Sequence, residues 1–192
     1  MGQQLVPAKG EGSKSGKPAT AGAGSDTQQF LTFVLGGEMY ALAILNVKEI
    51  IEYGNITEIP MMPSFIRGVI NLRGAVVPVV DLAARFGGKP SEVQRRTCIV
   101  IVEMAQDDTK VDIGIMVDAV SEVLEIARSE IEPPPSFGAR IRADFIDGMG
   151  KVAGKFVIIL NTQRVLSVEE MAHLASIAER PAEELVSEAQ VA

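Results

Sequence analysis

The sequence is poor in the residues on which most enzymes and metal sites depend. Among 192 residues it has one cysteine, one histidine and no tryptophan. Because Cys98 is alone, an intrachain disulfide and a cysteine-built zinc site are excluded. His173 lies off the apolar face of a helical pattern, and we interpret it as a solvated helix residue. Without paired acid, base or nucleophile groups, we expect no enzyme, no cofactor and no metal site.

Positive charge and aromatic side chains are also scarce. Lys and Arg total 18 against 25 Asp and Glu, a formal net charge of −7, and aromatic residues make up 5%. This balance argues against a nucleic-acid groove and against a polybasic membrane surface. No apolar run approaches the roughly 20 residues that a membrane-spanning helix needs, and the start lacks the apolar region of a secretory signal. We therefore expect a cytoplasmic protein whose partners are proteins, with no insertion into the membrane.

The chain divides into a polar tail, a body and a helical end. Residues 1–28 are rich in Gly, Ser, Lys, Ala and Thr without apolar periodicity, which predicts a disordered tail. The body spans 29–180 and closes with a helix predicted at 168–179. Pro181 interrupts this helix, so 181–192 is predicted to be a frayed acidic end.

Short β-type runs fill the body, and helical turns are few. Closely spaced strands with turn residues between them predict an all-β barrel or sandwich. Helical turns are expected at 47–51 and, with Asp81 as its cap, at 82–86. The predicted strands are 30–35, 38–44, 69–72, 75–80, 97–102, 111–117, 120–126 and 155–160.

The body partly repeats itself. Residues 40–52 and 113–125 share one pattern, a strand that leads into Val, any residue, Glu, two aliphatic residues and Glu. Further paired blocks are Pro63-Ser64-Phe65 with Pro135-Ser136-Phe137, Phe65-Ile66-x-Gly68 with Phe145-Ile146-x-Gly148, and the strands that end at Asp81 and Asn161. Blocks in the same order predict an internal duplication with two β-barrels of about five strands each.

The repeat separates what serves the fold from what serves a partner. Gly68 and Gly148 are shared, which is typical of turn or bulge positions. Arg73 has Ala153 as its counterpart, so the barrel design does not demand a guanidinium there. We expect Arg73 to serve a partner and to form an ion pair with Glu49.

One segment of the first repeat carries a family signature. It reads Phe65-Ile-Arg-Gly-Val-Ile-Asn-Leu-Arg-Gly-Ala-Val-Val-Pro-Val-Val-Asp-Leu82, and it resembles the signature of the CheW family of chemotaxis coupling proteins. The resemblance extends from Phe30 to about Leu174. It implies two intertwined SH3-like β-barrels, in agreement with the repeat. It also implies a non-catalytic adaptor that couples chemoreceptors to the histidine kinase CheA, in arrays at the inner face of the cell membrane.

The resemblance also implies two kinds of binding residue. The hairpin tips of chemoreceptors would bind in the groove between the barrels, at positions that match Val47, Glu49, Leu72, Arg73 and Gly74. The regulatory domain of CheA would contact one barrel near Val76 and the other through the turn that carries Phe137. Glu132, just ahead of that turn, departs from the basic residue expected in some relatives.

Other interpretations compete with this one. Glu49 has a counterpart in Glu122, so it can also serve the barrel, and Val47, Val76 and Phe137 can also be core residues. A coupling protein of a non-flagellar chemosensory pathway fits the same residues. A barrel that binds a small metabolite is a further alternative, but a metabolite pocket needs convergent polar or aromatic groups, which are few here.

Overall fold

The computed structural model describes residues 26–106, 109–135, 141–167 and 169. The turn that carries Phe137, the body of the predicted C-terminal helix and the acidic end therefore lie outside the described residues. So does the predicted tail up to residue 25, whereas Thr27 and Gln28 already belong to the first strand, so the folded body begins earlier than the sequence predicted. No helix in the described part of the chain is long and apolar enough to span a membrane.

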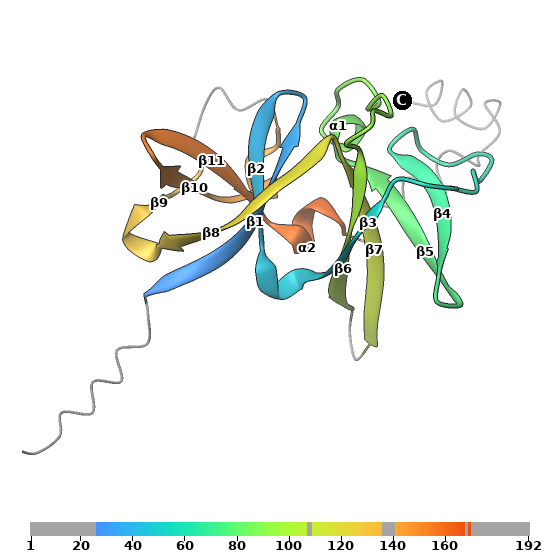
Figure 1. Ribbon diagram of the computed structural model, residues 1–192, viewed down its shortest axis with the longest axis horizontal. Helices are drawn as coiled ribbons and strands as arrows, with labels where there is room; N and C mark the ends of the chain where they lie inside the picture. Colours follow the sequence, from blue (N-terminus) through green and yellow to red (C-terminus); the bar gives the residue numbers. More distant parts are fainter. Residues whose placement is uncertain (1–25, 107–108, 136–140, 168, 170–192) are drawn as a thin grey trace, which may run out of the picture.

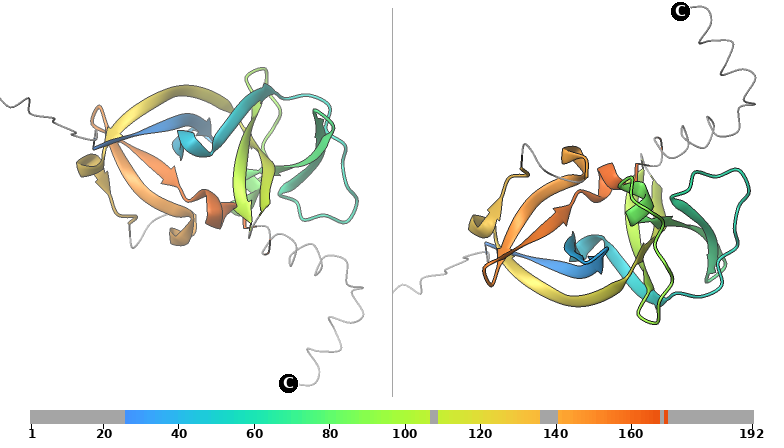
Figure 2. Two further views of the ribbon diagram at one scale, coloured as in Figure 1. Left: turned by 90° about the horizontal axis from the view of Figure 1, so that it is seen from below. Right: turned by 90° about the horizontal axis from the view of Figure 1, so that it is seen from above.

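The strands form two sheets that lie side by side, each curved around its own interior (Figures 1 and 2). We call them lobe A, with the order β8-β1-β2-β11-β10-β9, and lobe B, with the order β3-β6-β7-β5-β4. The two SH3-like barrels that were predicted are thus confirmed. The strands are β1 (Thr27–Leu35), β2 (Glu38–Ala43), β3 (Val47–Glu52), β4 (Ile66–Leu72), β5 (Ala75–Asp81), β6 (Cys98–Gln106), β7 (Thr109–Val117), β8 (Ala119–Ala127), β9 (Ile131–Glu132), β10 (Ile146–Val152) and β11 (Lys155–Leu160).

The two lobes have the same strand order once the strands are matched through the repeat. Strands β8, β1, β2, β11 and β10 of lobe A correspond to β3, β6, β7, β5 and β4 of lobe B. Each lobe also has one parallel pair at the same place, where Ile159 faces Ala41 in lobe A and Val79 faces Gly114 in lobe B. The internal duplication inferred from the sequence is therefore a property of the fold.

The chain is intertwined, because it crosses between the lobes twice. It leaves lobe A through the 3-10 turn η1 (Ile44–Asn46) and returns at Asp118, between β7 and β8. Each lobe therefore combines strands from both repeats. The helical turn predicted at 47–51 is wrong: these residues form β3, paired with β6, and the turn precedes them. β-branched Val and Ile side chains favour the strand, and six residues are too few for their spacing to distinguish the two.

Equivalent glycines lie at equivalent bulges. The register of β4 with β5 shifts between Ile66 and Gly68, and that of β10 with β11 shifts between Ile146 and Gly148. A Cβ on Gly68, whose φ is +139°, would collide with the backbone carbonyl oxygen of Thr57. A Cβ on Gly148 would lie 2.6 Å from Cγ2 of Ile131. Both positions need glycine because a neighbouring segment crosses close to the bulge.

Single helical turns close both repeats in the same way. The turns are α1 (Leu82–Arg85) and α2 (Thr162–Val165). The side chain of Asp81 accepts hydrogen bonds from the backbone of α1, and that of Asn161 accepts one from the backbone of α2. The capping role predicted from the sequence is confirmed.

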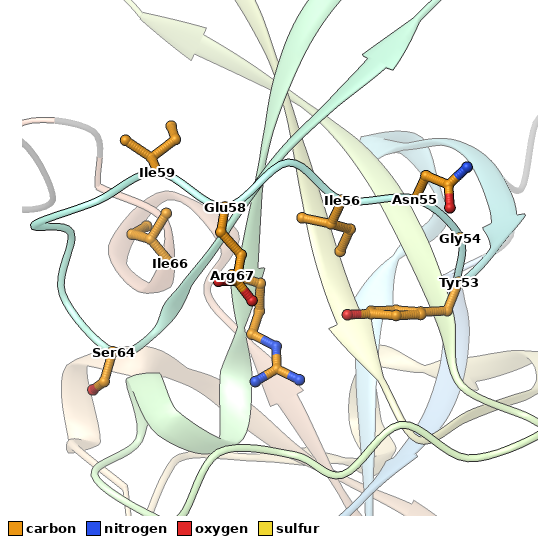
Figure 3. Close-up of a pocket in the computed structure, with 9 residues that line it drawn as sticks. All are labelled: Tyr53, Gly54, Asn55, Ile56, Glu58, Ile59, Ser64, Ile66 and Arg67. Atoms are coloured by element: carbon orange, nitrogen blue, oxygen red, sulfur yellow. The ribbon is translucent and has the colours of Figure 1, made fainter.

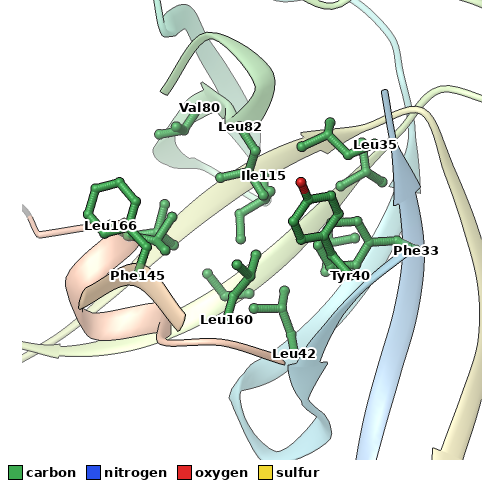
Figure 4. Close-up of a cluster of buried hydrophobic side chains, with 14 of the residues drawn as sticks. Phe33, Leu35, Tyr40, Leu42, Val80, Leu82, Ile115, Phe145, Leu160 and Leu166 are labelled. Atoms are coloured by element: carbon green, nitrogen blue, oxygen red, sulfur yellow. The ribbon is translucent and has the colours of Figure 1, made fainter. Parts of the chain in front are cut away.

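Three apolar cores hold the structure together. One lies inside each barrel, and the largest lies between the lobes and includes alternate residues of β1 and β6. Figure 4 shows part of it, in which Phe33 and Leu42 of lobe A lie near Ile115 of lobe B. Arg85 of α1 adds a polar clasp in this region. Its guanidinium lies 5.1 Å from the ring centre of Phe65 and 5.0 Å from that of Phe145, and its Nε donates a hydrogen bond of 3.0 Å to the carbonyl of Val165. Because Phe65 and Phe145 are repeat counterparts, Arg85 links equivalent points of the two lobes.

Candidate functional site

The turn between β4 and β5 presents Arg73 to solvent. Arg73 and Gly74 both have positive φ, 53° and 89°, as a two-residue hairpin turn that matches the twist of the strands requires. The side chain of Asn71 accepts a hydrogen bond of 2.9 Å from the backbone N–H of Gly74. The equivalent turn of lobe A has the same conformation, with φ of 48° at Ala153. The backbone of the turn is therefore shared, and only the side chain differs.

Arg73 forms the predicted ion pair with Glu49 of β3. One guanidinium nitrogen lies 2.9 Å from Oε2 of Glu49, and the side chains are 76% and 22% exposed. The other carboxylate oxygen, Oε1, is buried without a hydrogen-bond partner among the described residues. Because its arginine end is exposed, solvent screens this ion pair and its contribution to stability is small, so its geometry favours a role at the surface.

Val47 and Leu72 are less accessible than the ion pair. Both are half-buried: Val47 packs against the inter-lobe core, and Leu72 packs against the core of lobe B. Val47 therefore has the structural role that the sequence left open for it, and Leu72, for which no such role was predicted, also packs against a core. The structure brings Leu72, Arg73 and Gly74 together on one turn and joins this turn to β3 through Glu49.

Val76 lies on β5 with 72% of its surface exposed. Strand alternation accounts for this, because Val77 and Val79 point into the barrel. Its repeat counterpart Phe156 is also exposed, at 50%, and Leu45 on η1 is 94% exposed. Sequence reasoning did not single out Phe156 or Leu45. The repeat alignment of Phe156 with Val76 was the signal that could have found the first.

The predicted second contact is only partly described. Phe137 lies outside the described residues. Glu132 is exposed on β9 and faces Met149 of β10. It therefore points its carboxylate to solvent, where a partner can reach it.

The described side chains offer surface recognition and little chemistry. Hydrogen bonding to Asp112 raises the pKa of Lys48, so this lysine of β3 stays charged. Burial raises the pKa of the Cys98 thiol, which makes it a weak nucleophile near neutral pH. Among the described residues, no three His, Cys, Asp or Glu side chains lie close enough to hold a metal ion. A cavity of about 320 Å³ between the lobes is lined largely by aliphatic, aromatic and glycine residues, including Tyr40 and Phe86.

Comparison with known proteins gives one consistent family. The model of the CheW-like domain matches residues 29–170. The chemotaxis protein CheW of Klebsiella aerogenes is 36% identical over 151 residues, which cover 79% of this chain and 89% of that protein. Protein FrzA of Myxococcus xanthus is 28% identical over 150 residues, or 77% of this chain and 91% of that protein.

A solved structure agrees with the sequence comparison. The crystal structure of the scaffolding protein TtCheW from Thermoanaerobacter tengcongensis is 38% identical, with a TM-score of 0.66, and covers 73% of this chain and 93% of that chain. The similarity spans both lobes, because the matched residues run from β1 to beyond α2. The chain therefore belongs to the CheW-like family of chemotaxis proteins.

Proposed function

We propose that this chain is a non-catalytic adaptor that couples chemoreceptors to the histidine kinase CheA, in the cytoplasm at receptor arrays. The receptor tip binds at Val47, Glu49, Leu72, Arg73 and Gly74. The regulatory domain of the kinase binds at Val76 and at the turn that carries Phe137. The observation that carries the proposal is the exposed ion pair of Arg73 and Glu49, at a turn where lobe A has only Ala153.

The ion pair suits a receptor contact for a physical reason. Arg73 uses one nitrogen for Glu49 and keeps most of its surface accessible. The remaining guanidinium donors can form hydrogen bonds to carbonyl or carboxylate groups of a partner. Glu49 fixes the direction of the guanidinium, so less side-chain entropy is lost when the partner binds.

The test of the receptor surface is Arg73→Glu. We expect a change of about 0 to 1 kcal/mol in the free energy of unfolding, because Arg73 is 76% exposed and solvent screens the charge placed there. Receptor-dependent kinase activity should be lost in a reconstituted mixture of receptor, kinase and variant, because like charges then face each other at Glu49. Lys155→Glu, beside the equivalent turn of lobe A, is the matched control and should couple normally. Normal coupling by Arg73→Glu would show that the receptor binds elsewhere.

The test of the kinase surface is Val76→Glu. Because Val76 is 72% exposed, the variant should fold as the parent protein does. Its affinity for the isolated regulatory domain of CheA should fall about tenfold or more, since a carboxylate replaces an apolar contact at an interface. Binding to receptors measured by co-sedimentation should stay unchanged. If Val76→Glu binds the regulatory domain as tightly as the parent protein, the kinase uses another surface.

A second candidate is the same adaptor role in a pathway other than flagellar chemotaxis. The similarity of this chain to protein FrzA supports this second candidate. Deletion of the gene distinguishes the two, because loss of chemotactic swimming supports the first and a defect confined to another form of motility supports the second.

A further inference from the structure

One cavity lies in lobe B, apart from the residues assigned above. It measures about 470 Å³ and is formed by the segment 53–59 and the start of β4. Its lining is mainly polar, and in Figure 3 the hydroxyl of Tyr53 points toward Arg67. The lining residues are Tyr53, Gly54, Asn55, Ile56, Glu58, Ile59, Ser64, Ile66 and Arg67.

The loop 87–97 is hydrogen-bonded to two of the residues that line this cavity. Its far end is joined to Tyr53, whose backbone N–H donates a hydrogen bond of 3.3 Å to the carbonyl of Thr97. Its middle is joined to Arg67, whose guanidinium donates a hydrogen bond of 3.2 Å to the carbonyl of Ser91. The loop and the cavity therefore form one continuous surface.

The loop is held in place by a buried carboxylate. Asp81 has no exposed surface, and besides capping α1 it accepts hydrogen bonds of 2.7 and 3.0 Å from the backbone N–H and the hydroxyl of Ser91. Its repeat counterpart Asn161 caps α2 in the same way. The capping role of this side chain is thus shared by both lobes, whereas the two hydrogen bonds from Ser91 to Asp81 fix the position of the loop.

The loop concentrates positive charge on an acidic chain. Lys89, Arg95 and Arg96 are exposed, and none of them forms an ion pair among the described residues. With Arg67 they give this surface four cations against the carboxylates of Glu58 and Glu92, in a chain whose net charge is −7. Unpaired cations on a fixed loop attract an acidic partner.

Apolar side chains stand beside these cations. Val93 of the loop is 51% exposed, and Ile59 and Met61 of the segment before β4 are 40% and 63% exposed. Met61 also has φ of +65°, a left-handed conformation that is strained for a side chain of this kind. Exposed methionine suits a binding surface, because its flexible side chain adapts to a partner.

We propose that the cavity and the loop 87–97 bind an acidic segment of a partner protein, as a site separate from the surfaces of the proposed receptor and kinase contacts. Carboxylates of the segment pair with Arg95, Arg96 and Lys89, and an apolar side chain packs against Val93 and Met61. The cavity accepts a polar side chain through Arg67. This assignment does not depend on which pathway the adaptor serves.

The experiment titrates the isotope-labelled full chain with a short synthetic peptide of Glu and Asp with interspersed Leu, followed by NMR. We expect the amide shifts to concentrate in 53–67 and 87–97. Arg95→Glu combined with Arg96→Glu should weaken binding about tenfold or more, and salt should weaken binding to the parent protein. The matched control combines Lys151→Glu and Lys155→Glu, which reverses two exposed charges of lobe A and should leave the affinity unchanged.

Three results would overturn the proposal. The first is shifts that avoid both segments, and the second is equal loss of affinity in the Arg and Lys variants, which would indicate non-specific attraction. The third is binding of duplex DNA or anionic lipid vesicles that needs Arg95 and Arg96 while the peptide does not bind, which would assign the loop to another class of partner. A leucine-free acidic peptide that binds as tightly would remove the apolar part of the site.

Discussion

The two lobes are the same design carried out with different surfaces. Both have the same strand order, the same bulge at a glycine, the same hairpin turn with two positive φ values and the same capped helical turn. They differ where side chains reach solvent or the other lobe: Arg73 replaces Ala153, and Arg85 replaces Val165. Features that both lobes share are thus explained by the needs of the barrel fold. Features found in one lobe alone are explained by recognition of a partner or by contact between the lobes.

Substitution of the two bulge glycines tests whether the equivalent bulges are equally constrained, and it should give the largest losses of stability. Gly68→Ala adds both left-handed strain and a collision with a backbone oxygen that cannot move aside, so we expect a loss of roughly 3 kcal/mol or more in the free energy of unfolding. Gly148→Ala meets the γ2 methyl of Ile131 at 2.6 Å and the backbone carbonyl oxygen of Glu132 at 3.0 Å, but without left-handed strain, and roughly 1 to 2 kcal/mol is expected. Denaturant unfolding of both variants decides the order. Equal losses would show that the two bulges are equally constrained.

Arg85 tests the clasp between the lobes. Arg85→Met keeps the length of the side chain but removes the contacts of the cation with Phe65 and Phe145 and the hydrogen bond to Val165. We expect a loss of about 1 to 2 kcal/mol in unfolding free energy. Arg164→Met, an exposed change on α2, is the control and should cost less than about 0.5 kcal/mol. A loss in the control as large as that in Arg85→Met would remove the special role of the clasp.

The smallest effect on stability is expected from transferring the signature arginine. Ala153→Arg places a guanidinium on the lobe A turn, whose φ at residue 153 already matches that of Arg73. Stability should change by less than about 0.5 kcal/mol, measured by thermal unfolding. When combined with Arg73→Ala, it should not restore receptor coupling, because the partner surface around Glu49 is absent. Restored coupling would mean that the turn alone is recognised.

The repeat explains how much of this structure could be predicted from the sequence. The barrel pair, the bulge at Gly68, the cap at Asp81 and the pairing of Arg73 with Glu49 all follow from short motifs or from comparing one half of the chain with the other. The error at 47–51 arose where a short segment had no longer pattern to decide between strand and helical turn.

Other features depend on contacts between segments that are far apart in the chain. Arg85 lies between two phenylalanines that only the closed fold brings together. The cavity beside Arg67 lies between the segment 53–59 and the start of β4, and the loop 87–97 reaches it through the hydrogen bond of Arg67 to Ser91. No local pattern encodes such distances. The full exposure of Leu45 on η1 likewise follows from the path of the crossing and not from its neighbours in sequence.

The double crossing of the chain gives the two lobes different folding histories during synthesis. All strands of lobe B lie between Val47 and Val117, so this lobe can close as soon as β7 leaves the ribosome. Strands β1 and β2 of lobe A are made first, but their outer partners, β8 and β11, are made last. Until then the first hairpin has two open edges, which favour aggregation. The early closure of lobe B supplies an apolar face for β1, so the second barrel is built on the first.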